Sequence, residues 1–333
     1  MKIMTVAGPG GLDDLKLVER DEPKPAHGQV LVRWRATSLN YHDYLIALGG
    51  LPVPAGRCPM SDGAGEIAAL GDGVDGWRVG DRVYSLFFPN WHSGRPSPDK
   101  TGAISGETID GYACEYSCVD AGSLTAIPDG YTFEEAATLP CAALTAWRGL
   151  VEEGQMKAGD SVLIEGSGGM SIFGLQLAKA AGARVYATSS SDEKLARLKA
   201  LGADEVLNYT TDANWGKTVA EMSGGGVDHV LDAGGESTLG QSLEAVRMGG
   251  NISLIGVLGG FTANIMLPTA FFKHVNLYGI AVGSRDMQQA MNAAIEVSGF
   301  KPVIDRQFAL ADLSEAFEYQ GSGAHFGKIV VSY

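Results

Sequence analysis

The stretch SVLIEGSGGMSIFGLQLAKAAG, residues Ser161–Gly182, decides the fold. Five residues of buried-strand character, Ser161–Glu165, lead into a glycine cluster at 166–169 and then into an apolar helical pattern. Backbone N–H groups at such a helix start, with no Cβ in the way, form a site for a pyrophosphate. A second strand, Arg184–Thr188, follows at the distance that a βαβ crossover needs. The stretch therefore predicts a strand, turn and helix that bind a dinucleotide.

The glycine pattern departs from the usual dinucleotide fingerprint at one place. Ser171 stands where the third glycine of G-x-G-x-x-G would be. A bare glycine triplet also fits a loop–helix junction of some other α/β protein. The convincing strand before the turn and the convincing helix after it favour the dinucleotide interpretation.

The end of the second strand indicates which dinucleotide is bound. An NAD site usually places an Asp or Glu there, on the ribose 2′-hydroxyl. This chain has Ser189, Ser190 and Ser191 followed by Lys194, which offer hydroxyl donors and a positive charge to a 2′-phosphate. We therefore predict NADPH over NADH. In the competing interpretation Ser191 merely caps the helix Asp192–Leu201 and Lys194 points to solvent.

Length and charge exclude several classes of function. The chain has 333 residues, enough for two domains, with 45% apolar and 19% charged residues and a net charge of −14. Nucleic acid and anionic membranes are unexpected partners, because either needs a basic face. No apolar run approaches the roughly 18 residues of a membrane span, and the first residues lack signal-peptide architecture. We therefore expect a cytoplasmic protein.

The four cysteines do not suggest a disulfide framework or a metal site. Cys58, Cys114, Cys118 and Cys141 show no C-x-x-C spacing. Cys114 and Cys118 would share a face of one strand, where a bridge between them is poorly placed. Buried free thiols are expected for most of them.

The first 125 or so residues predict a β-rich domain. Short strand patterns cover Val30–Ala36, Gly63–Leu70 and Asp81–Leu86, with glycine turns between them. Between Phe87 and Gly111 the sequence has little periodicity. A loop of that length in a compact domain is often functional.

From about Asp129 the pattern changes to helices and then to alternating strands and helices. Helical stretches at 133–139 and 142–151 are joined at Pro140 and Cys141. Strands are then expected at 161–165, 184–188, 205–208, 227–231, 251–255 and 275–281, and helices at 171–181, 192–201, 212–222, 238–247 and 268–273. This alternation predicts an α/β fold with a doubly wound parallel sheet.

After Asp286–Ser298 the tail returns to mixed character, with the stretch Val303–Phe308, a helix at 313–320 and a closing strand at 328–332. A nucleotide-binding domain is therefore inserted into the β-rich domain, whose last piece is the C-terminus. We place the inserted domain at 126–283 and the β-rich domain at 1–125 plus 284–333.

Several motifs together resemble the medium-chain dehydrogenase/reductase superfamily, and within it the zinc-independent quinone oxidoreductase-like branch. Besides the glycine turn, the resemblance rests on Thr37–Asp43, Ser61–Glu66, Leu139–Trp147, Leu254–Val257 and His325–Val330. It implies a Rossmann NADP-binding domain inserted into a GroES-like catalytic domain. It also implies a homodimer that forms by pairing of sheet edges through about Asn276–Ile280, a run apolar enough to need covering.

The resemblance fails at the positions of the catalytic metal. Zinc-dependent members have a cysteine where this chain has about Asn40 and Tyr41, and a His-Glu pair where it has Ser61 and Asp62. Only Cys141 falls on a ligand position, and a catalytic zinc needs three protein ligands. The 87–111 segment lacks the cysteines of a structural zinc lobe. A metal site assembled from His42, Asp43, His92 and Cys141 is the remaining alternative.

Without a Lewis acid, an enzyme can transfer hydride to some classes of compound more readily than to others. Oxidising a simple alcohol needs something to stabilise the departing alkoxide. A quinone or α,β-unsaturated carbonyl takes hydride at carbon and delocalises the charge onto oxygen, so hydrogen bonds and one proton donor suffice. We therefore expect a reductase of quinones or enones, a small-molecule enzyme with NADPH as cofactor.

The expected catalytic residues lie in the motif that resembles the family's substrate side. Tyr41 is the candidate proton donor or oxyanion partner, and Asn40 the candidate hydrogen-bond donor to substrate or cofactor. Alternatively, Tyr41 packs and water supplies the proton. Trp91 and His92 could stack on an acceptor, or Trp91 could anchor the loop. Phe271 and Phe326 are expected in the core or in the wall of the site.

On the cofactor side, the resemblance carries over residue by residue. It implies Thr145, with Gly168, Gly169 and Met170 at the pyrophosphate and Ser190, Lys194 and Tyr209 at the adenosine phosphate, beside Ser189 at the strand end. Towards the nicotinamide it implies Ile255, Val257, Val282, Ser284 and, at the end of the chain, Lys328.

Two other functions stay open. One is an NADP-dependent alcohol or aldehyde dehydrogenase of the same superfamily, against which the ligand count argues. The other is an NADPH-binding sensor with little turnover, which no residue in the sequence excludes.

Overall fold

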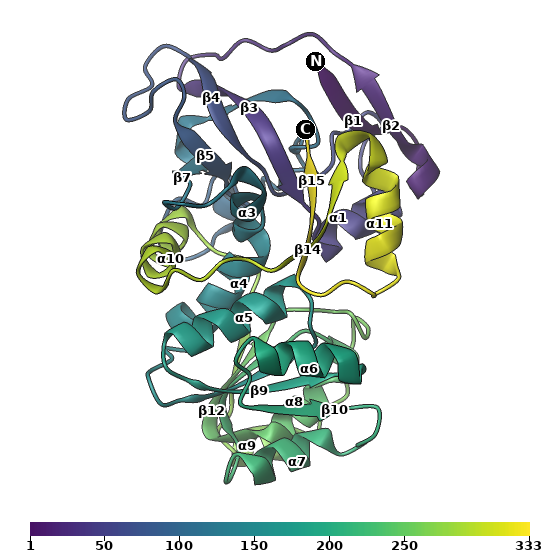
Figure 1. The fold of residues 1–333 in the computed structure, drawn as a ribbon, viewed down its shortest axis with the longest axis vertical. Helices are drawn as coiled ribbons and strands as arrows, with labels where there is room; N and C mark the ends of the chain where they lie inside the picture. The colour runs from purple at the N-terminus through teal and green to yellow at the C-terminus, as the bar shows by residue number, and fades with distance from the viewer. The chain divides into compact units, whose positions relative to one another are not determined.

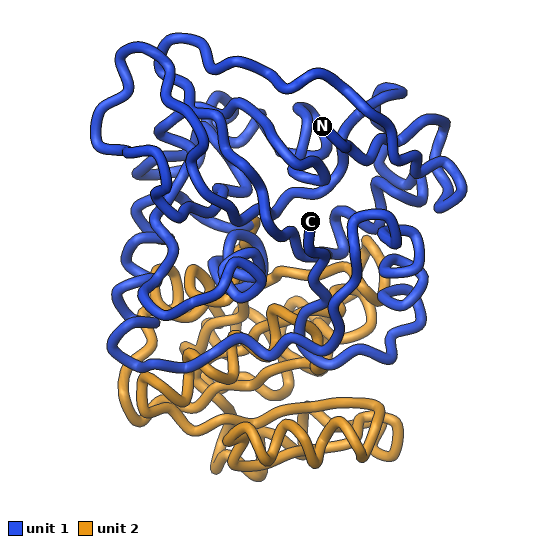
Figure 2. The backbone as a smooth tube through the Cα atoms, turned by 45° about the horizontal axis from the view of Figure 1, so that its top comes forward, with its two compact units in different colours: residues 1–144, 282–333 blue, residues 145–281 orange.

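The computed structural model describes residues 1–333. The chain forms two compact units: unit 1 is Met1–Leu144 with Val282–Tyr333, and unit 2 is Thr145–Ala281 (Figure 2). The first boundary lies later than the predicted 125/126 because the helix α3, Phe133–Ala137, packs on the strands of unit 1. The ring of Phe133 has the guanidinium carbon of Arg82 4.5 Å from its centroid and that of Arg35 at 5.7 Å.

Unit 1 is built on antiparallel strands. Its strands are β1 Lys2–Val6, β2 Leu15–Glu19, β3 Gln29–Ser38, β4 Ala64–Leu70, β5 Arg82–Ser85, β6 Tyr116–Asp120, β7 Leu124–Ala126, β14 Ile304–Ala309 and β15 Lys328–Ser332. β1 and β2 form a two-stranded sheet. The others form a sheet in the order β14-β15-β3-β4-β5-β7, with β6 also paired to β3, and β14–β15 is its one parallel pair.

The apolar alternation of β3 explains its central place in unit 1. Val30, Val32 and Trp34 are buried in the core, and the Trp34 indole N–H donates to Ser117 Oγ at 2.7 Å. The unit also contains the helices α1 Tyr41–Ala47, α2 Pro98–Thr101, α3, α10 Arg285–Ser298 and α11 Leu313–Gly321, and the short helices η1 Leu12–Asp14, η2 Ala121–Ser123 and η6 Leu310–Asp312. α11 lies beside α1 and β15 (Figure 1).

The predicted break at Pro140 is a change of helical pitch rather than a break. A helical run continues through π-helical η3 Leu139–Ala143, α4 Leu144–Trp147 and π-helical η4 Arg148–Glu153. Proline lacks the N–H that an α-helix would use and its ring crowds the preceding turn, so a wider turn forms there.

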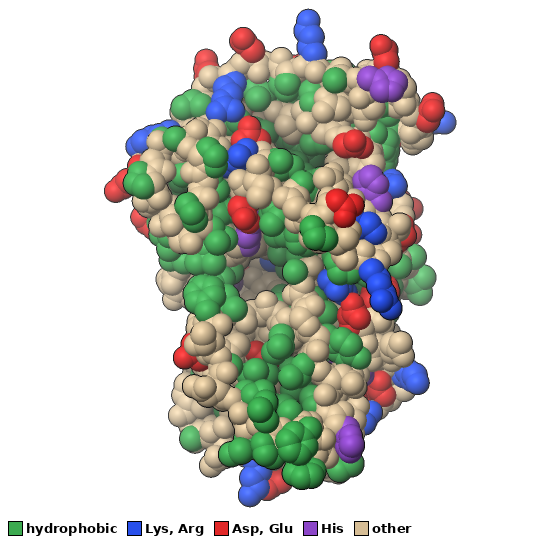
Figure 3. All heavy atoms as spheres, turned by 180° about the vertical axis from the view of Figure 1, so that it is seen from behind, with side chains coloured by type: hydrophobic (Ala, Val, Ile, Leu, Met, Phe, Trp, Pro, Cys, Tyr) green, Lys and Arg blue, Asp and Glu red, His purple; other side chains and the backbone are tan.

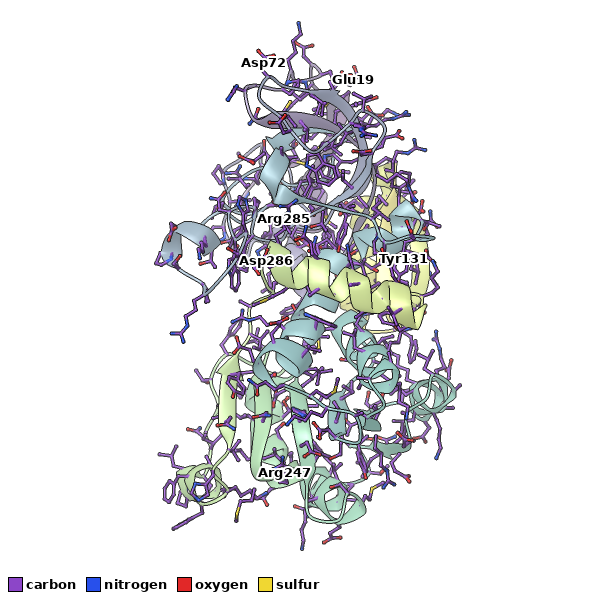
Figure 4. All side chains as sticks on the ribbon, turned by 90° about the vertical axis from the view of Figure 1, so that its left-hand side faces the viewer. Glu19, Asp72, Tyr131, Arg247, Arg285 and Asp286 are labelled. Atoms are coloured by element: carbon purple, nitrogen blue, oxygen red, sulfur yellow. The ribbon has the colours of Figure 1, made fainter.

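The long segment 87–111 is anchored to unit 1 by buried aromatic side chains. Phe87, Phe88 and Trp91 are buried, and the Trp91 indole N–H donates to the carbonyl oxygen of Gly94 at 2.8 Å. The carbonyl oxygens of Trp91 and His92 accept from the backbone N–H groups of Arg285 and Asp286, at the first turn of α10 (Figure 4). Trp91 is therefore a structural anchor, and its ring is not available for stacking on a substrate.

Unit 2 has the predicted doubly wound parallel sheet. Its strands are β8 Ser161–Glu165, β9 Arg184–Ser189, β10 Glu205–Asn208, β11 Val227–Asp232, β12 Val246–Leu254 and β13 Asn276–Gly279, in the order β10-β9-β8-β11-β12-β13. Its helices are α5 Gly169–Ala180, α6 Asp192–Ala200, α7 Trp215–Met222, α8 Leu239–Ala245 and α9 Leu267–Phe272, with the short η5 Gly235–Ser237. α5 and α6 cover one face and α7 and α8 the other (Figure 1).

The glycine stretch folds as a tight turn and a closely packed helix. Gly166, with φ of 77°, makes the turn, and a Cβ on Gly174 would lie 2.5 Å from a Leu231 methyl carbon. Close approach of helix and sheet therefore depends on Gly174. Ser171, at the position of the missing third glycine, is buried and donates to the Glu165 carbonyl oxygen at 2.7 Å.

The end of α8 and the exposure of Phe271 differ from the sequence-based expectation. β12 begins at Val246, which pairs with Val227, so the preceding helix ends at Ala245 instead of 247. Phe326 in unit 1 is buried as expected, but Phe271 on α9 is 57% exposed.

No helix of either unit combines the length and the apolar character needed to cross a membrane.

Candidate functional sites

The first candidate site is the N-terminus of α5 in unit 2. Gly168 is the N-cap residue, with φ of −75°, a value open to any residue. A Cβ on Gly168 would meet no protein atom within 4 Å. The N–H groups of the first helical turn, at Gly169 and Met170, have no acceptor within the helix. Open space in front of unpaired N–H groups fits a phosphate, so the residues present suit a dinucleotide.

The predicted adenosine-side residues lie at two neighbouring strand ends. Ser189 ends β9 and pairs with Asn208, the last residue of β10. The Tyr209 N–H donates to the Ser189 carbonyl oxygen at 3.2 Å, and the Tyr209 side chain is exposed, as is Ser190. The structure therefore brings Ser189, Ser190 and Tyr209 together at the carboxyl edge of the sheet.

Helix α6 starts at the same edge. Ser191 caps it, since its Oγ accepts from the Lys194 N–H at 3.3 Å, so the capping role considered for Ser191 is confirmed. Lys194 is half-buried in the first turn. The nearby carboxylate of Asp192 accepts from Asn208 Nδ2 at 2.7 Å. No acidic side chain ends β9 itself.

Beneath this edge lies a buried pair of carboxyl groups that the sequence analysis did not single out. Glu165 ends β8 and Asp232 ends β11, the two strands at which the order of the sheet reverses. Ser242 Oγ lies 2.6 Å from Glu165 Oε1 and 2.7 Å from Asp232 Oδ2. Burial, reinforced by the Asp232 charge, raises the pKa of Glu165 to about 8. The signal in the sequence was two adjacent parallel strands that both end in an acid.

The remaining cofactor-side residues divide between the units. Thr145 is buried in unit 2, where Ile255 and Val257 are half-buried just after β12. Val282, Ser284 and Lys328 belong to unit 1 instead. Ser284 is the N-cap of α10, and its Oγ accepts from the Met287 N–H at 3.4 Å.

The second candidate site surrounds the start of α1 in unit 1. Asn40, the N-cap residue, is buried, and its Nδ2 donates to Asp62 Oδ2 at 2.9 Å and to Ser61 Oγ at 3.2 Å. Its Oδ1 accepts from Lys328 Nζ at 2.6 Å. Both amide hydrogens are therefore used within the unit. This corrects the expectation that Asn40 donates to substrate or cofactor: its geometry suits a positioning residue.

Lys328 is a buried ammonium in the middle of this cluster. Its side chain is 4% exposed, and Nζ also donates to the Leu39 carbonyl oxygen at 2.6 Å and lies 3.8 Å from Asp62 Oδ2. Burial raises the pKa of Asp62 to about 7, although the Lys328 charge opposes that shift. The ammonium thus neutralises a carboxyl group that would otherwise be costly to ionise.

Asp43 completes the cluster from the first turn of α1. Its buried carboxylate accepts from the Ser61 N–H at 2.8 Å, from Ser61 Oγ at 3.1 Å and from the Asn40 N–H at 3.1 Å. These contacts fix the direction in which α1 leaves β3. They also fix the place of the residue at the start of the helix, Tyr41.

On that first turn Tyr41 is exposed, whereas His42 contacts an acidic side chain of the 87–111 segment. Tyr41 is 37% exposed, and its ring centroid lies 6.1 Å from that of Tyr44. Its hydroxyl has no hydrogen bond to the protein. His42 Nε2 lies 2.7 Å from Glu107 Oε2. Burial opposes its protonation, but Asp43 and Glu107 outweigh this and raise the pKa of His42 to about 9. His42 is therefore a cation that ties the 87–111 segment to α1.

The chain belongs to the medium-chain dehydrogenase/reductase superfamily. Residues 26–129 match the alcohol dehydrogenase GroES-like domain, and residues 169–296 match the zinc-binding dehydrogenase domain. A zinc-type alcohol dehydrogenase-like protein of Schizosaccharomyces pombe is 43% identical over 331 residues, covering 96% of each chain. The protein is therefore an oxidoreductase of this superfamily, as the sequence motifs indicated.

Two solved structures extend the similarity over nearly the whole of this chain. An NAD-dependent alcohol dehydrogenase is 31% identical with a TM-score of 0.92, and 100% of both chains is covered. The 2-octenoyl-CoA carboxylase reductase CinF, in complex with NADP and 2-octenoyl-CoA, is 27% identical with a TM-score of 0.87, covering 99% of this chain and 87% of that one.

The zinc that the second domain's description implies does not fit the residues of this chain. At the resembling ligand positions stand Asn40, Ser61 and Asp62, which bond to one another and to the Lys328 ammonium. No three His, Cys, Asp or Glu side chains gather into a group that could hold a metal ion. The Lys328 ammonium already lies beside the Asp62 carboxyl group, so a divalent ion there would be repelled.

Proposed function

We propose that the protein is an NADPH-dependent, zinc-independent reductase of quinones or α,β-unsaturated carbonyl compounds. The observation that carries the proposal is the Lys328 ammonium beside Asn40 and Asp62, at positions where the family resemblance implies metal ligands in zinc-dependent members. A site without a Lewis acid favours acceptors that delocalise negative charge themselves. The solved relative that binds NADP and 2-octenoyl-CoA supports this class, because that ligand contains a conjugated carbonyl.

Each unit has its own part in this function. In unit 2, Gly168, Gly169 and Met170 would hold the pyrophosphate, and NADPH, when bound, supplies the hydride. In unit 1, Tyr41 would donate a hydrogen bond or proton to the acceptor oxygen. Asn40 would position Tyr41 at the start of α1. The free hydroxyl and 37% exposure of Tyr41 leave it able to do so.

The relatives do not decide between the two nicotinamide cofactors, because one is named NAD-dependent and another binds NADP. The chain's own residues favour NADPH. β9 ends in serines without an acid, and Lys194 lies in the next helical turn. Hydroxyl groups and an ammonium suit a 2′-phosphate.

Replacing Lys194 by alanine is therefore expected to raise the Kd for NADPH about tenfold, the weight of one charge-assisted contact, and to leave the Kd for NADH nearly unchanged. Fluorescence titration with both cofactors measures this. Lys199→Ala, at the other end of α6, is the matched control. Equal losses for NADPH and NADH in Lys194→Ala would overturn the assignment.

The names of the relatives favour a second candidate, an NADP-dependent alcohol or aldehyde dehydrogenase. That activity would have to work without a metal, or with a metal held in a way that the donor set does not suggest. Turnover of alcohols that a chelator abolishes would select this candidate over the reductase.

We also propose a homodimer formed through unit 2. β13 is an edge strand paired only to β12, so its outer edge is open. Exposed apolar side chains lie in the segment between β12 and β13, which includes α9, and on β13 itself: Leu258, Phe261, Met266, Leu267, Phe271, Phe272 and Leu277. Apolar side chains gather in the part of the surface formed by unit 2 (Figure 3). A patch of this kind is typical of a protein interface, and a second copy could pair edge to edge along 276–280.

The double substitution Phe272→Asp and Leu277→Asp is expected to convert the dimer to a monomer. It places charges of one sign in the patch, and in a symmetric dimer these charges face the like charges of the second copy in an apolar interface. Light scattering at micromolar concentration reports the mass. Val297→Asp, at a 91% exposed apolar residue of α10 in unit 1, should remain dimeric. A wild-type mass equal to one chain would contradict the proposal.

A further inference from the structure

Glu165 and Asp232 end neighbouring parallel strands at the centre of the unit 2 sheet, and one hydroxyl group lies between them. Ser242 Oγ is 2.6 Å from Glu165 Oε1 and 2.7 Å from Asp232 Oδ2. Asp232 and Ser242 are fully buried and Glu165 is 4% exposed. Neither of the proposed catalytic residues takes part in this cluster.

The two short contacts of Ser242 require a proton on one carboxyl group. A serine hydroxyl has one hydrogen to donate, so it cannot donate to both acids. Asp232 Oδ1 already accepts from the Gly235 N–H and from Thr238 Oγ1, each at 2.8 Å, which stabilises an ionised Asp232. Glu165 Oε2 accepts from the Ala233 N–H at the longer distance of 3.1 Å, and burial raises the pKa of Glu165. The proton therefore lies on Glu165 Oε1, which donates to Ser242, which in turn donates to Asp232.

We propose that Glu165, Ser242 and Asp232 hold one shared proton. This proton fixes the turn between β8 and α5 and the turn after β11, so that NADPH binding weakens when the proton is lost. The identity of the ligand rests on the proposed function. The two turns meet at Glu165: its carbonyl oxygen accepts from Ser171 in α5, and Oε2 accepts from the N–H of Ala233. Two ionised carboxyl groups around a single hydroxyl would repel each other and push the turns apart.

The other charged groups of the packed elements are engaged elsewhere. Glu236 in η5 contacts Thr262, and on α8 Glu244 is not buried. The cations on these elements bind other partners: Lys179 of α5 pairs with Asp204, Arg247 of β12 with Asp228, and Lys273 with carbonyl oxygens at the C-terminal end of α8. Asp232 is therefore the charge that acts on Glu165.

The direction of the pH effect follows from the raised pKa of Glu165. Its pKa is about 8 in the folded protein, against 4.5 ordinarily, so between these values the folded state holds a proton that the unfolded state has lost. Stability from this group is complete below about pH 4.5 and is lost as the pH rises through 8. Asp62 and His42 in unit 1 also have raised pKa values, so they add to the pH dependence of stability. Their contribution must be subtracted to isolate that of Glu165.

The test compares wild type with Glu165→Gln between about pH 6 and pH 9.5, by thermal unfolding and by NADPH titration. The glutamine amide donates to Ser242 at every pH, and unit 1 is the same in both proteins. We expect the wild-type Tm to fall more steeply with pH than that of the variant. The wild-type Kd for NADPH should rise about tenfold over that range, the effect of one pKa unit of linkage, and stay nearly constant in the variant.

Two further variants keep the test decisive. In Asp232→Asn the amide donates to Ser242, which then donates to an ionised Glu165, so the pH dependence should also flatten. Glu193→Gln, at an exposed carboxyl in the first turn of α6, should keep the wild-type profile. Infrared difference spectra should show a protonated-carboxyl band near neutral pH in wild type that Glu165→Gln lacks.

Identical pH profiles of Tm in wild type, Glu165→Gln and Asp232→Asn would overturn the shared proton. A flattened Tm profile with a pH-independent wild-type Kd would overturn its role in cofactor binding. A flattened Tm profile in a protein that binds NADPH at no pH would uphold the proton and refute the proposed function instead.

Discussion

Replacement of Gly168 by valine is expected to raise the Kd for NADPH at least about 100-fold, or about 2.7 kcal/mol, with little change in stability. The space into which a Cβ would project holds no protein atom within 4 Å, and φ of −75° is allowed for valine. The branched side chain would nevertheless occupy the place of the pyrophosphate and block the N–H groups of the first turn. Calorimetric titration and thermal unfolding measure the two effects.

The matched control is Gly240→Val on α8, another glycine whose added Cβ meets no protein atom within 4 Å. It should bind NADPH as wild type does. A Gly168→Val protein that binds NADPH normally would show that the cofactor does not use the N-terminus of α5.

Removal of the Tyr41 hydroxyl is expected to lower kcat on α,β-unsaturated carbonyl substrates about 100-fold, the contribution of one well-placed general acid. Phenylalanine keeps the ring against Tyr44, and the loss of a hydroxyl without a protein partner should leave the Tm unchanged. Steady-state kinetics of Tyr41→Phe with NADPH at saturation measures the effect.

Tyr44→Phe is the control, because it removes a phenol from the same helix one turn further on. It should retain wild-type kcat. An unchanged rate of Tyr41→Phe on every acceptor would remove Tyr41 from the mechanism and leave water as the proton source.

Much of the fold could be predicted because its signals are local. β8, β10 and β15 have the predicted bounds, since each is a short stretch with an apolar centre between polar end residues. The boundary near Leu144 could not be predicted, because α3 joins unit 1 through the contact of Phe133 with Arg35 and Arg82. Those arginines are far from Phe133 in sequence.

The candidate sites show the same division between local and distant information. The glycine turn and the serine-rich strand end were found because each is a continuous motif. The commitment of Asn40 to Lys328, 288 residues further on, has no local signal. Likewise, the proton between Glu165 and Asp232 depends on Ser242 of α8, which comes between them only when the sheet has formed. The exposure of Phe271 reflects an uncovered surface, which apolar periodicity cannot distinguish from a core.

The most direct test of the proposed function measures the oxidation of NADPH by chelator-treated protein. Quinones, enones and aldehydes serve as acceptors, and NADH replaces NADPH as the control. We expect turnover of quinones or enones that survives chelation and is faster with NADPH than with NADH. Activity restricted to aldehydes, activity that the chelator abolishes, or tight NADPH binding without turnover of any acceptor would contradict the proposed function.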